Sequence, residues 1–118
     1  MNISRDIGTQ HESRACAFLK KQGLTLLKKN YRCKMGELNL IFSELSTIVF
    51  VEVRFRQSNS YGGALASVTP SKQQKLIKTA LYSLKQSKRG FDHPIRFDVV
   101  IIEGKQGHIN WIKNAISC

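Results

Sequence analysis

The chain has 118 residues, 42% of them hydrophobic and 23% charged, so length and composition predict one globular domain that spans residues 1–118 and builds its own core. No stretch approaches the roughly 18 consecutive apolar residues of a membrane helix, and the first residues lack the apolar centre of a secretory signal, which argues against a membrane partner and favours the cytoplasm. The 19 lysines and arginines against 8 aspartates and glutamates give a formal charge of +11, which favours nucleic acid as the partner over a surface that is basic only for solubility.

The cysteines and histidines form no familiar metal or catalytic motif. Cys16, Cys33 and Cys118 are odd in number and far apart, unlike a disulfide framework or a C-x-x-C zinc pattern. We expect reduced thiols, with Cys16 in the core. The histidines lack the H-E-x-x-H spacing, and the sequence contains neither a P-loop nor a G-x-S-x-G motif.

The first half of the chain predicts a helix followed by three strands. Residues 9–22 favour a helix, with Gly23 placed to end it in a left-handed conformation. The strands are expected over residues 24–32, 37–42 and 47–56, with a tight connection at residues 43–46 between the last two.

The second half predicts a helix and two strands. Thr69 followed by Pro70 is a typical helix start, and the helix should run over residues 70–86 with one apolar and one lysine-rich face. Residues 95–102 form an apolar run typical of a buried strand, and residues 108–112 predict a last strand. The order of helix, three strands, helix and two strands indicates an α/β fold.

Polar side chains gather on the predicted hairpin. Alternate residues of a strand share a face, so Glu52 and Arg54 point one way, and Glu37 and Asn39 share a face of the preceding strand. A turn centred on the Glu44–Leu45 bond sets Glu37 directly across from Glu52. A turn shifted by one residue instead sets Asn39 opposite Glu52 and Glu37 opposite Arg54. Either register clusters polar side chains on one face of the sheet.

Two carboxylates about 5 Å apart across a hairpin repel each other, and the cost rises where apolar neighbours exclude water. Arg54 offsets part of this repulsion, and a divalent cation offsets it fully, because Mg²⁺ binds carboxylates together with phosphate oxygens. The hairpin therefore predicts a metal site around Glu37 and Glu52. The alternative is an exposed hairpin face of ordinary charged residues in salt bridges.

Two further polar side chains fall on faces that we expect to pack. Glu12 shares a helix face with small and apolar residues, which favours a place beside the hairpin carboxylates. Alternatively, Thr9 and Glu12 form a capping box that merely starts the helix. Gln73 lies in the apolar stripe of the second helix, where its amide needs a partner either in the site or on the backbone.

A series of short motifs runs along nearly the whole chain: Gly8-x-x-x-Glu12-x-x-Ala15, Asn30-Tyr31-Arg32, GELNLI at residues 36–41, FVEVRFR at residues 50–56, Tyr61-Gly62-Gly63, Ser67-Val68-Thr69, Ser71-Lys72-Gln73 and RFDVV at residues 96–100. Together they resemble the YraN family of small bacterial proteins. That family is similar to archaeal Holliday-junction resolvases and, more distantly, to the PD-(D/E)xK nucleases. The resemblance implies a restriction-endonuclease-like fold, with a mixed central sheet of about five strands flanked by helices.

The resemblance also assigns roles to residues. It makes Glu12 a helix carboxylate near the metal and Glu52 the acidic residue of the (D/E)xK pair, with Arg54 at the lysine position. Asn39 stands where the family usually has the aspartate of G-E-I-D-L-I, so it keeps an amide oxygen but no negative charge, and Glu37 can compensate as a ligand. Arg54 cannot serve as a base, because it does not release its proton. The implied ligands of Mg²⁺ or Mn²⁺ are therefore Glu37, Asn39 and Glu52.

Charge and resemblance together predict a nucleic-acid-binding, endonuclease-like protein, with branched or structured DNA favoured by the resemblance alone. Metal-dependent hydrolysis of phosphodiesters stays open, because the changes at Asn39 and Arg54 make binding safer to predict than cleavage. The alternatives are a catalytically weak or inactive DNA- or RNA-binding module on the same fold, and a small ribosome-associated protein. The oligomeric state stays open, with a homodimer as one alternative. The candidate catalytic residues are Glu12, Glu37, Asn39, Glu52, Arg54 and Gln73, and the candidate phosphate contacts are Lys34, Arg54, Arg56, Lys72, Lys75 and Lys78.

Overall fold

The computed structural model describes residues 3–56, 68–87, 93–104 and 107–116, with the backbone alone over residues 3–8. The motif at residues 61–63 and Cys118 lie outside these ranges. The elements follow the predicted order of helix, three strands, helix and two strands. They are α1 (Ile3–Lys21), β1 (Thr25–Cys33), β2 (Gly36–Glu44), β3 (Thr47–Arg56), α2 (Pro70–Gln86), β4 (Ile95–Glu103) and β5 (His108–Ile116).

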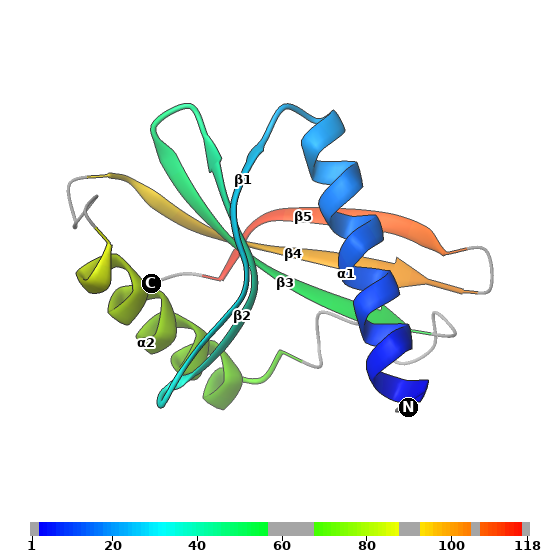
Figure 1. The fold of residues 1–118 in the computed structure, drawn as a ribbon, viewed down its shortest axis with the longest axis horizontal. Helices are drawn as coiled ribbons and strands as arrows, with labels where there is room; N and C mark the ends of the chain where they lie inside the picture. The colour runs from blue at the N-terminus through cyan, green and yellow to red at the C-terminus, as the bar shows by residue number, and fades with distance from the viewer. Residues whose placement is uncertain (1–2, 57–67, 88–92, 105–106, 117–118) are drawn as a thin grey trace.

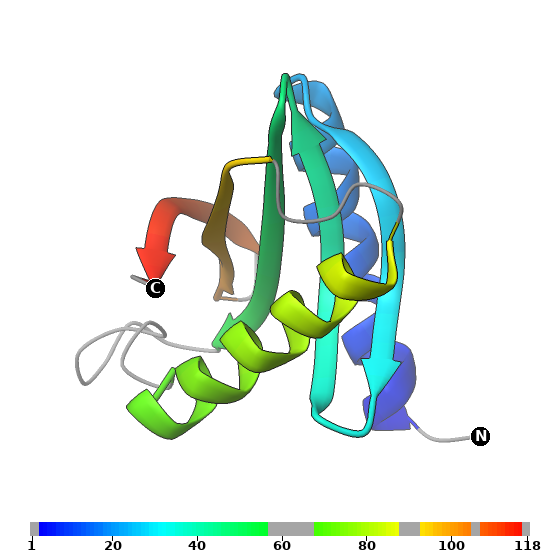
Figure 2. The same ribbon diagram turned by 90° about the vertical axis from the view of Figure 1, so that its left-hand side faces the viewer.

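The strands form one mixed five-stranded sheet in the order β1-β2-β3-β4-β5. β3 and β4 run parallel, and all other neighbours run antiparallel. The helices α1 and α2 lie on opposite faces of this sheet (Figure 1, Figure 2). The described chain is thus an α/β protein with a mixed sheet and two helices, as the sequence predicts. No helix in these ranges is long and apolar enough to cross a membrane.

A hydrophobic layer fills each side of the sheet, because successive side chains of β3 point to opposite faces. Cys16 is buried in the layer under α1, which confirms its predicted place in the core. That layer also contains Ala15, Leu19, Leu40, Phe42, Val49 and Val51. The layer under α2 contains Leu38, Phe50, Leu76, Ala80, Leu84 and Phe97.

The two helix starts differ in how far local sequence determines them. α2 begins at Pro70, as predicted, and the Thr69 side chain accepts a hydrogen bond from a backbone N–H of the first turn. α1 begins at Ile3 rather than at residue 9, so the capping-box interpretation of Thr9 is wrong. Thr9 and Glu12 match that pattern but lie inside the helix, where Glu12 has a partner in the sheet instead.

The β2–β3 hairpin adopts the second of the two registers considered for it. Its ladder ends with the pairing of Leu40 and Val51, so the register that sets Glu37 directly across from Glu52 is wrong. The turn consists of two residues and lies one position later along the chain than that register requires. Its first residue, Leu45, adopts a φ of +54°, the left-handed conformation on which such tight hairpin turns depend.

Asp98 of β4 is fully buried, and its partners come largely from the neighbouring strand. Its carboxylate accepts hydrogen bonds from the Arg96 guanidinium, from the Trp111 indole N–H at 2.9 Å and from the Asn114 backbone N–H at 2.9 Å. A carboxylate is tolerated in a core only when its oxygens are satisfied in this way. These bonds fasten β5 to β4.

Candidate functional site

The polar residues singled out in the sequence gather where β2 and β3 stop pairing. Beyond the Leu40–Val51 pair the ladder ends, and the two strands diverge (Figure 1). We call residues 36–39 of β2 together with residues 52–56 of β3 the fork. The fork places the start of one strand and the end of the other between the two helices.

Asn39 links both sides of the fork to α1. Its Oδ1 accepts a hydrogen bond from the Val53 N–H at 2.8 Å, and its Nδ2 donates to Oε1 of Glu12 at 3.1 Å. Burial, followed by the negative charge of Glu37, raises the pKa of Glu12 above its ordinary value. The hydrogen bond from Asn39 and the charge of Arg32 act in the opposite direction. Glu12 therefore lies beside the hairpin, as one of its two interpretations predicts.

Glu52 and Arg54 form a charged pair on the other side of the fork. Nη2 of Arg54 lies 3.2 Å from a Glu52 carboxylate oxygen, and the two side chains are 26% and 15% exposed respectively. Burial raises the pKa of Glu52, against the lowering effects of Arg54 and of the Val53 N–H. Asn39 Oδ1 accepts a hydrogen bond from the N–H of Val53, the residue that follows Glu52, while its Nδ2 reaches toward Glu12 of α1.

A cavity of about 150 Å³ lies between the fork and α2. Its lining includes two acidic residues, Glu37 and Glu52, and three basic residues, Arg54, Lys72 and Lys75. Nε of Arg54 is buried and finds no hydrogen-bond acceptor within the described part of the chain. Leaving a buried guanidinium N–H unpaired is costly, so a movement of the Arg54 side chain that exposes this N–H to the cavity would let an anion satisfy it.

Gly36 lets the turn between β1 and β2 approach α2 closely. A Cβ at this position would lie 2.8 Å from Oγ1 of Thr79, closer than side chains pack. Its φ of +151° also lies in a region that residues with a side chain rarely adopt. The glycine therefore allows the close packing that brings Lys72 and Lys75 over the fork.

The side-chain amide of Gln73 bonds to the backbone and does not take part in the site. Its Nε2 donates to the Val68 carbonyl oxygen at 2.9 Å, just before the start of α2. Gln73 is not among the residues that line the cavity. Of its two interpretations, the structural one is confirmed, and its place among the catalytic candidates has no geometric support.

The structure divides the candidate phosphate contacts into two groups. Arg54, Lys72 and Lys75 line the cavity together. Those that do not line it are Lys34, exposed in the turn between β1 and β2, Lys78, exposed on α2, and Arg56, at the end of β3.

The oxygen donors at the fork are of the kind that hard divalent cations bind. Glu37 and Glu52 line the cavity, whereas the predicted ligand Asn39 is not among its described lining residues and bonds instead to Glu12 and to the Val53 N–H. Glu37 is 42% exposed and lies 3.5 Å from Arg32, so a surface ion pair also engages it. Across residues 3–56, 68–87, 93–104 and 107–116, no three His, Cys, Asp or Glu side chains converge to hold a metal. The arrangement fits a cation only if substrate or water oxygens complete its coordination.

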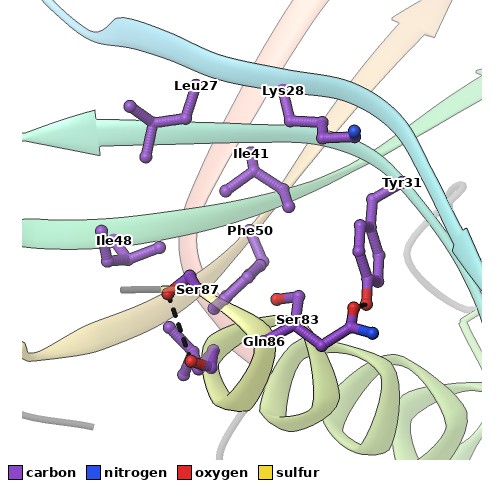
Figure 3. Close-up of a pocket in the computed structure, with 10 residues that line it drawn as sticks. Leu27, Lys28, Tyr31, Ile41, Ile48, Phe50, Ser83, Gln86 and Ser87 are labelled. Carbon is purple, nitrogen blue, oxygen red and sulfur yellow. Dashed lines mark hydrogen bonds between the residues drawn. The ribbon is translucent and has the colours of Figure 1, made fainter. Parts of the chain in front are cut away.

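A second cavity, of about 340 Å³, lies at the far end of α2 and is mainly apolar (Figure 3). Ile41, Ile48 and Phe50 from the sheet line it, and at its rim the Tyr31 hydroxyl donates to Oε1 of Gln86 at 2.6 Å. None of the described residues that line it is acidic. Lys28 is the one charged residue among the described residues that line it, so we assign the candidate site to the smaller cavity, which combines acidic and basic residues.

The aromatic pair on the α1 side of the fork was not identified from the sequence. Phe55 is 42% exposed at the end of β3, and its ring stacks on that of His11, with centroids 4.2 Å apart and planes at 12°. Burial, followed by the charge of Arg14, lowers the pKa of His11, which favours a neutral ring. The position of Phe55 between Arg54 and Arg56 is the one sequence signal that could have drawn attention to it.

The mixed sheet, the helices on opposite faces and the charged fork define an α/β protein whose polar site lies where its central hairpin opens. A family model described as "Uncharacterised protein family UPF0102" matches residues 11–102, and the chain belongs to this family. UPF0102 is the family called YraN above, so that resemblance is confirmed.

The similarity to relatives extends over almost the full chain. A UPF0102 protein of Nitrosomonas europaea is 49% identical over 116 residues, which cover 98% of this chain and 97% of the relative. A UPF0102 protein of Vibrio campbellii is 48% identical over 114 residues, covering 96% and 93% respectively. A UPF0102 protein of Pseudomonas aeruginosa is 46% identical over 116 residues, covering 95% and 93%.

Proposed function

We propose that this protein binds nucleic acid, with DNA preferred, by holding a backbone phosphate in the cavity between the fork and α2. The observation that carries this proposal is that three cationic residues, Arg54, Lys72 and Lys75, line one cavity. Nε of Arg54 also has no acceptor in the described ranges. Phosphate oxygens accept charge-assisted hydrogen bonds, and the planar guanidinium suits their geometry. Glu52 holds Nη2 of Arg54, so the guanidinium is oriented before a phosphate arrives.

The charge of the whole chain supports the same partner. A formal charge of +11 attracts polyphosphate from a distance, and the release of its counterions supplies affinity that does not depend on sequence. The finer assignment to a restriction-endonuclease-like fold, and the preference for branched or structured DNA, are supported by the resemblance. Of the residues that this resemblance singles out, Asn39 and Glu52 belong to the fork, and Glu12 accepts a hydrogen bond from Asn39.

The binding proposal is tested with two double variants that remove the same charge from different places. Lys72→Gln with Lys75→Gln neutralises the cavity wall. Lys20→Gln with Lys21→Gln neutralises two exposed lysines in the last turn of α1, on the opposite face of the sheet. Fluorescence anisotropy with labelled duplex DNA should show about a tenfold loss of affinity for the first variant, because two phosphate contacts disappear, and a much smaller loss for the second. Equal losses of DNA affinity in the two variants would show that the lysines of the cavity contribute no more to binding than lysines elsewhere on the surface.

A second candidate activity is slow hydrolysis of a phosphodiester with Mg²⁺ or Mn²⁺. The two acidic residues that line one cavity, Glu37 and Glu52, favour it. When bound, such a cation supplies an activated water and charge neutralisation. The residues Glu37, Asn39 and Glu52 would hold it, while Arg54 binds the phosphate and stabilises the charge that develops on its oxygens.

The hydrolysis proposal predicts opposite effects of Glu52→Gln on cleavage and on binding. Cleavage of labelled DNA in Mn²⁺ should fall by orders of magnitude, because a charged ligand is lost. DNA affinity measured in EDTA should stay equal or rise, because a carboxylate is removed from the path of the phosphate. Cleavage that survives this substitution unchanged would place the activity elsewhere or in a contaminant.

A further inference from the structure

An exposed aromatic ring lies on the α1 side of the fork, one residue from the cavity arginine. Phe55 is 42% exposed although it belongs to the middle strand of the sheet. One face of its ring is covered by His11, whose ring lies nearly parallel to it at a centroid distance of 4.2 Å. The exposed surface of Phe55 therefore belongs to its edge and its opposite face.

This ring is held in place before any ligand binds. β3 keeps its pairing with β4 through Phe55, which lies opposite Ile102, so the backbone at the ring is fixed. His11 projects from α1, a helix anchored in the core by Ala15 and Cys16. Neither ring nitrogen of His11 has a hydrogen-bond partner in the described part of the chain, so His11 serves as a flat backing surface. A group ordered in advance loses little side-chain entropy on binding.

The ring and the cavity are neighbours across the fork. Arg54 lines the cavity on the α2 side, and Phe55, the next residue, faces α1 because strand side chains alternate. β2 no longer pairs with β3 at these positions, so on that side the sheet does not separate the two groups. A strand of nucleic acid whose phosphate lies at Arg54 and that crosses this edge of β3 would bring a base to Phe55, the next residue along the strand.

We propose that Phe55, backed by His11, is a stacking platform for an unpaired base of the nucleic acid whose phosphate binds at Arg54. The inference rests on the proposed nucleic-acid binding and narrows its substrate to single-stranded or locally unpaired segments, because the faces of paired bases are covered by their neighbours. Every base has a π-face, so this contact tolerates any sequence. The cavity cations favour a nucleotide over an apolar peptide as the occupant, because an apolar peptide brings them no opposite charge.

The test uses three DNA probes and one substitution. The probes are a short fluorescein-labelled single strand, a strand of the same length with abasic nucleotides throughout, and the corresponding duplex. Phe55→Leu keeps apolar bulk but removes the π-face. We expect wild type to bind the intact strand more tightly than the abasic one, and Phe55→Leu to lose about tenfold in affinity for the intact strand while its affinity for the other two probes changes little.

A second variant keeps the test decisive. Phe55→Trp offers a larger ring and should bind the intact strand at least as tightly as wild type, while thermal melts verify that both variants fold. If Phe55→Leu does not fold, the affinity of Phe55→Trp for the intact strand is divided by its affinity for the abasic strand. This ratio is compared with that of wild type and should be at least as large. A wild type that binds none of the probes overturns the proposed function together with this inference. A wild type that binds intact and abasic strands equally, or a folded Phe55→Leu that keeps its preference, overturns the stacking platform alone.

Discussion

At the scale of single residues, Asn39 satisfies Glu12 without a cation. Its Nδ2 donates to Oε1 of Glu12 at 3.1 Å, while its Oδ1 accepts from the Val53 N–H. An aspartate at this position would set one carboxylate oxygen against another at the same distance. Two carboxylates so close cannot both stay ionised unless a proton or a cation lies between them. The amide therefore removes a repulsion that an aspartate would bring to this position.

Asn39→Asp should make the stability of the protein depend on divalent metal. In EDTA we expect a lower Tm than that of wild type, because repulsion replaces the hydrogen bond to Glu12. Added Mg²⁺ should then raise the Tm of the variant more than that of wild type, since the cation binds the folded state. Asn110→Asp, the same change at an exposed position of β5, is the matched control. If Mg²⁺ shifts the Tm of both variants alike, the residues at positions 37, 39 and 52 do not hold a shared cation.

Glu52→Gln should stabilise the protein near neutral pH. Burial raises the pKa of Glu52 above its ordinary value of 4.5, so the folded state binds its proton more tightly than the unfolded chain does. The stabilisation from that proton is complete below about 4.5 and is lost as the pH rises through the raised pKa. Glutamine keeps the shape without the charge. Urea denaturation in EDTA should show that the free energy of unfolding of Glu52→Gln exceeds that of wild type by less as the pH falls. A difference that grows as the pH falls would contradict burial as the dominant cause of the raised pKa.

At the scale of elements, the close packing of the β1–β2 turn on α2 shapes the cavity. Gly36→Ala would place a Cβ 2.8 Å from Oγ1 of Thr79, so we expect a loss of about 1–3 kcal/mol in the free energy of unfolding. DNA affinity should fall as well, because α2 carries Lys72 and Lys75. Urea denaturation and anisotropy measure the two effects. Adding Thr79→Ala should recover part of the stability, and no recovery at all would mean that this contact is not the cause.

The elements that the sequence predicts best are those whose signals are local. α2 starts at Thr69–Pro70 and β3 spans its predicted residues, because a cap and a run of β-branched residues decide them. The start of α1 is not predictable in this way, because Thr9 matches the sequence pattern of an N-cap although it lies inside the helix. The hairpin register is decided by Leu45, whose positive φ no rule for leucine anticipates.

The candidate site was predictable in part for the same reason. Alternation along one strand puts Glu52 and Arg54 on one face, and both line the cavity. The stack of Phe55 on His11 joins a strand end to a helix from a distant part of the chain, so no periodicity reveals it. The partners of Asp98 likewise come from a strand whose alignment the sequence does not specify.

At the scale of the whole molecule, the charge and the site make separate contributions to binding. The formal charge of +11 attracts any polyanion and helps it to arrive, whereas the cavity decides where a phosphate stays. If positive charge spread over the whole surface binds DNA, then removing any two lysines should change the salt dependence of affinity alike. If defined residues contact the phosphates, then only the removal of those lysines should change it strongly.

The salt dependence of DNA binding therefore tests the central claim most directly. Each neutralised phosphate contributes about 0.9 to the slope of log affinity against log salt on duplex DNA. With contacts at Arg54, Lys72 and Lys75, we predict a wild-type slope of about −2.7 or steeper, and a slope smaller in magnitude by about 1.8 for the Lys72→Gln, Lys75→Gln double variant. A flat response in wild type, or the same slope in both proteins, would contradict a phosphate site at the fork.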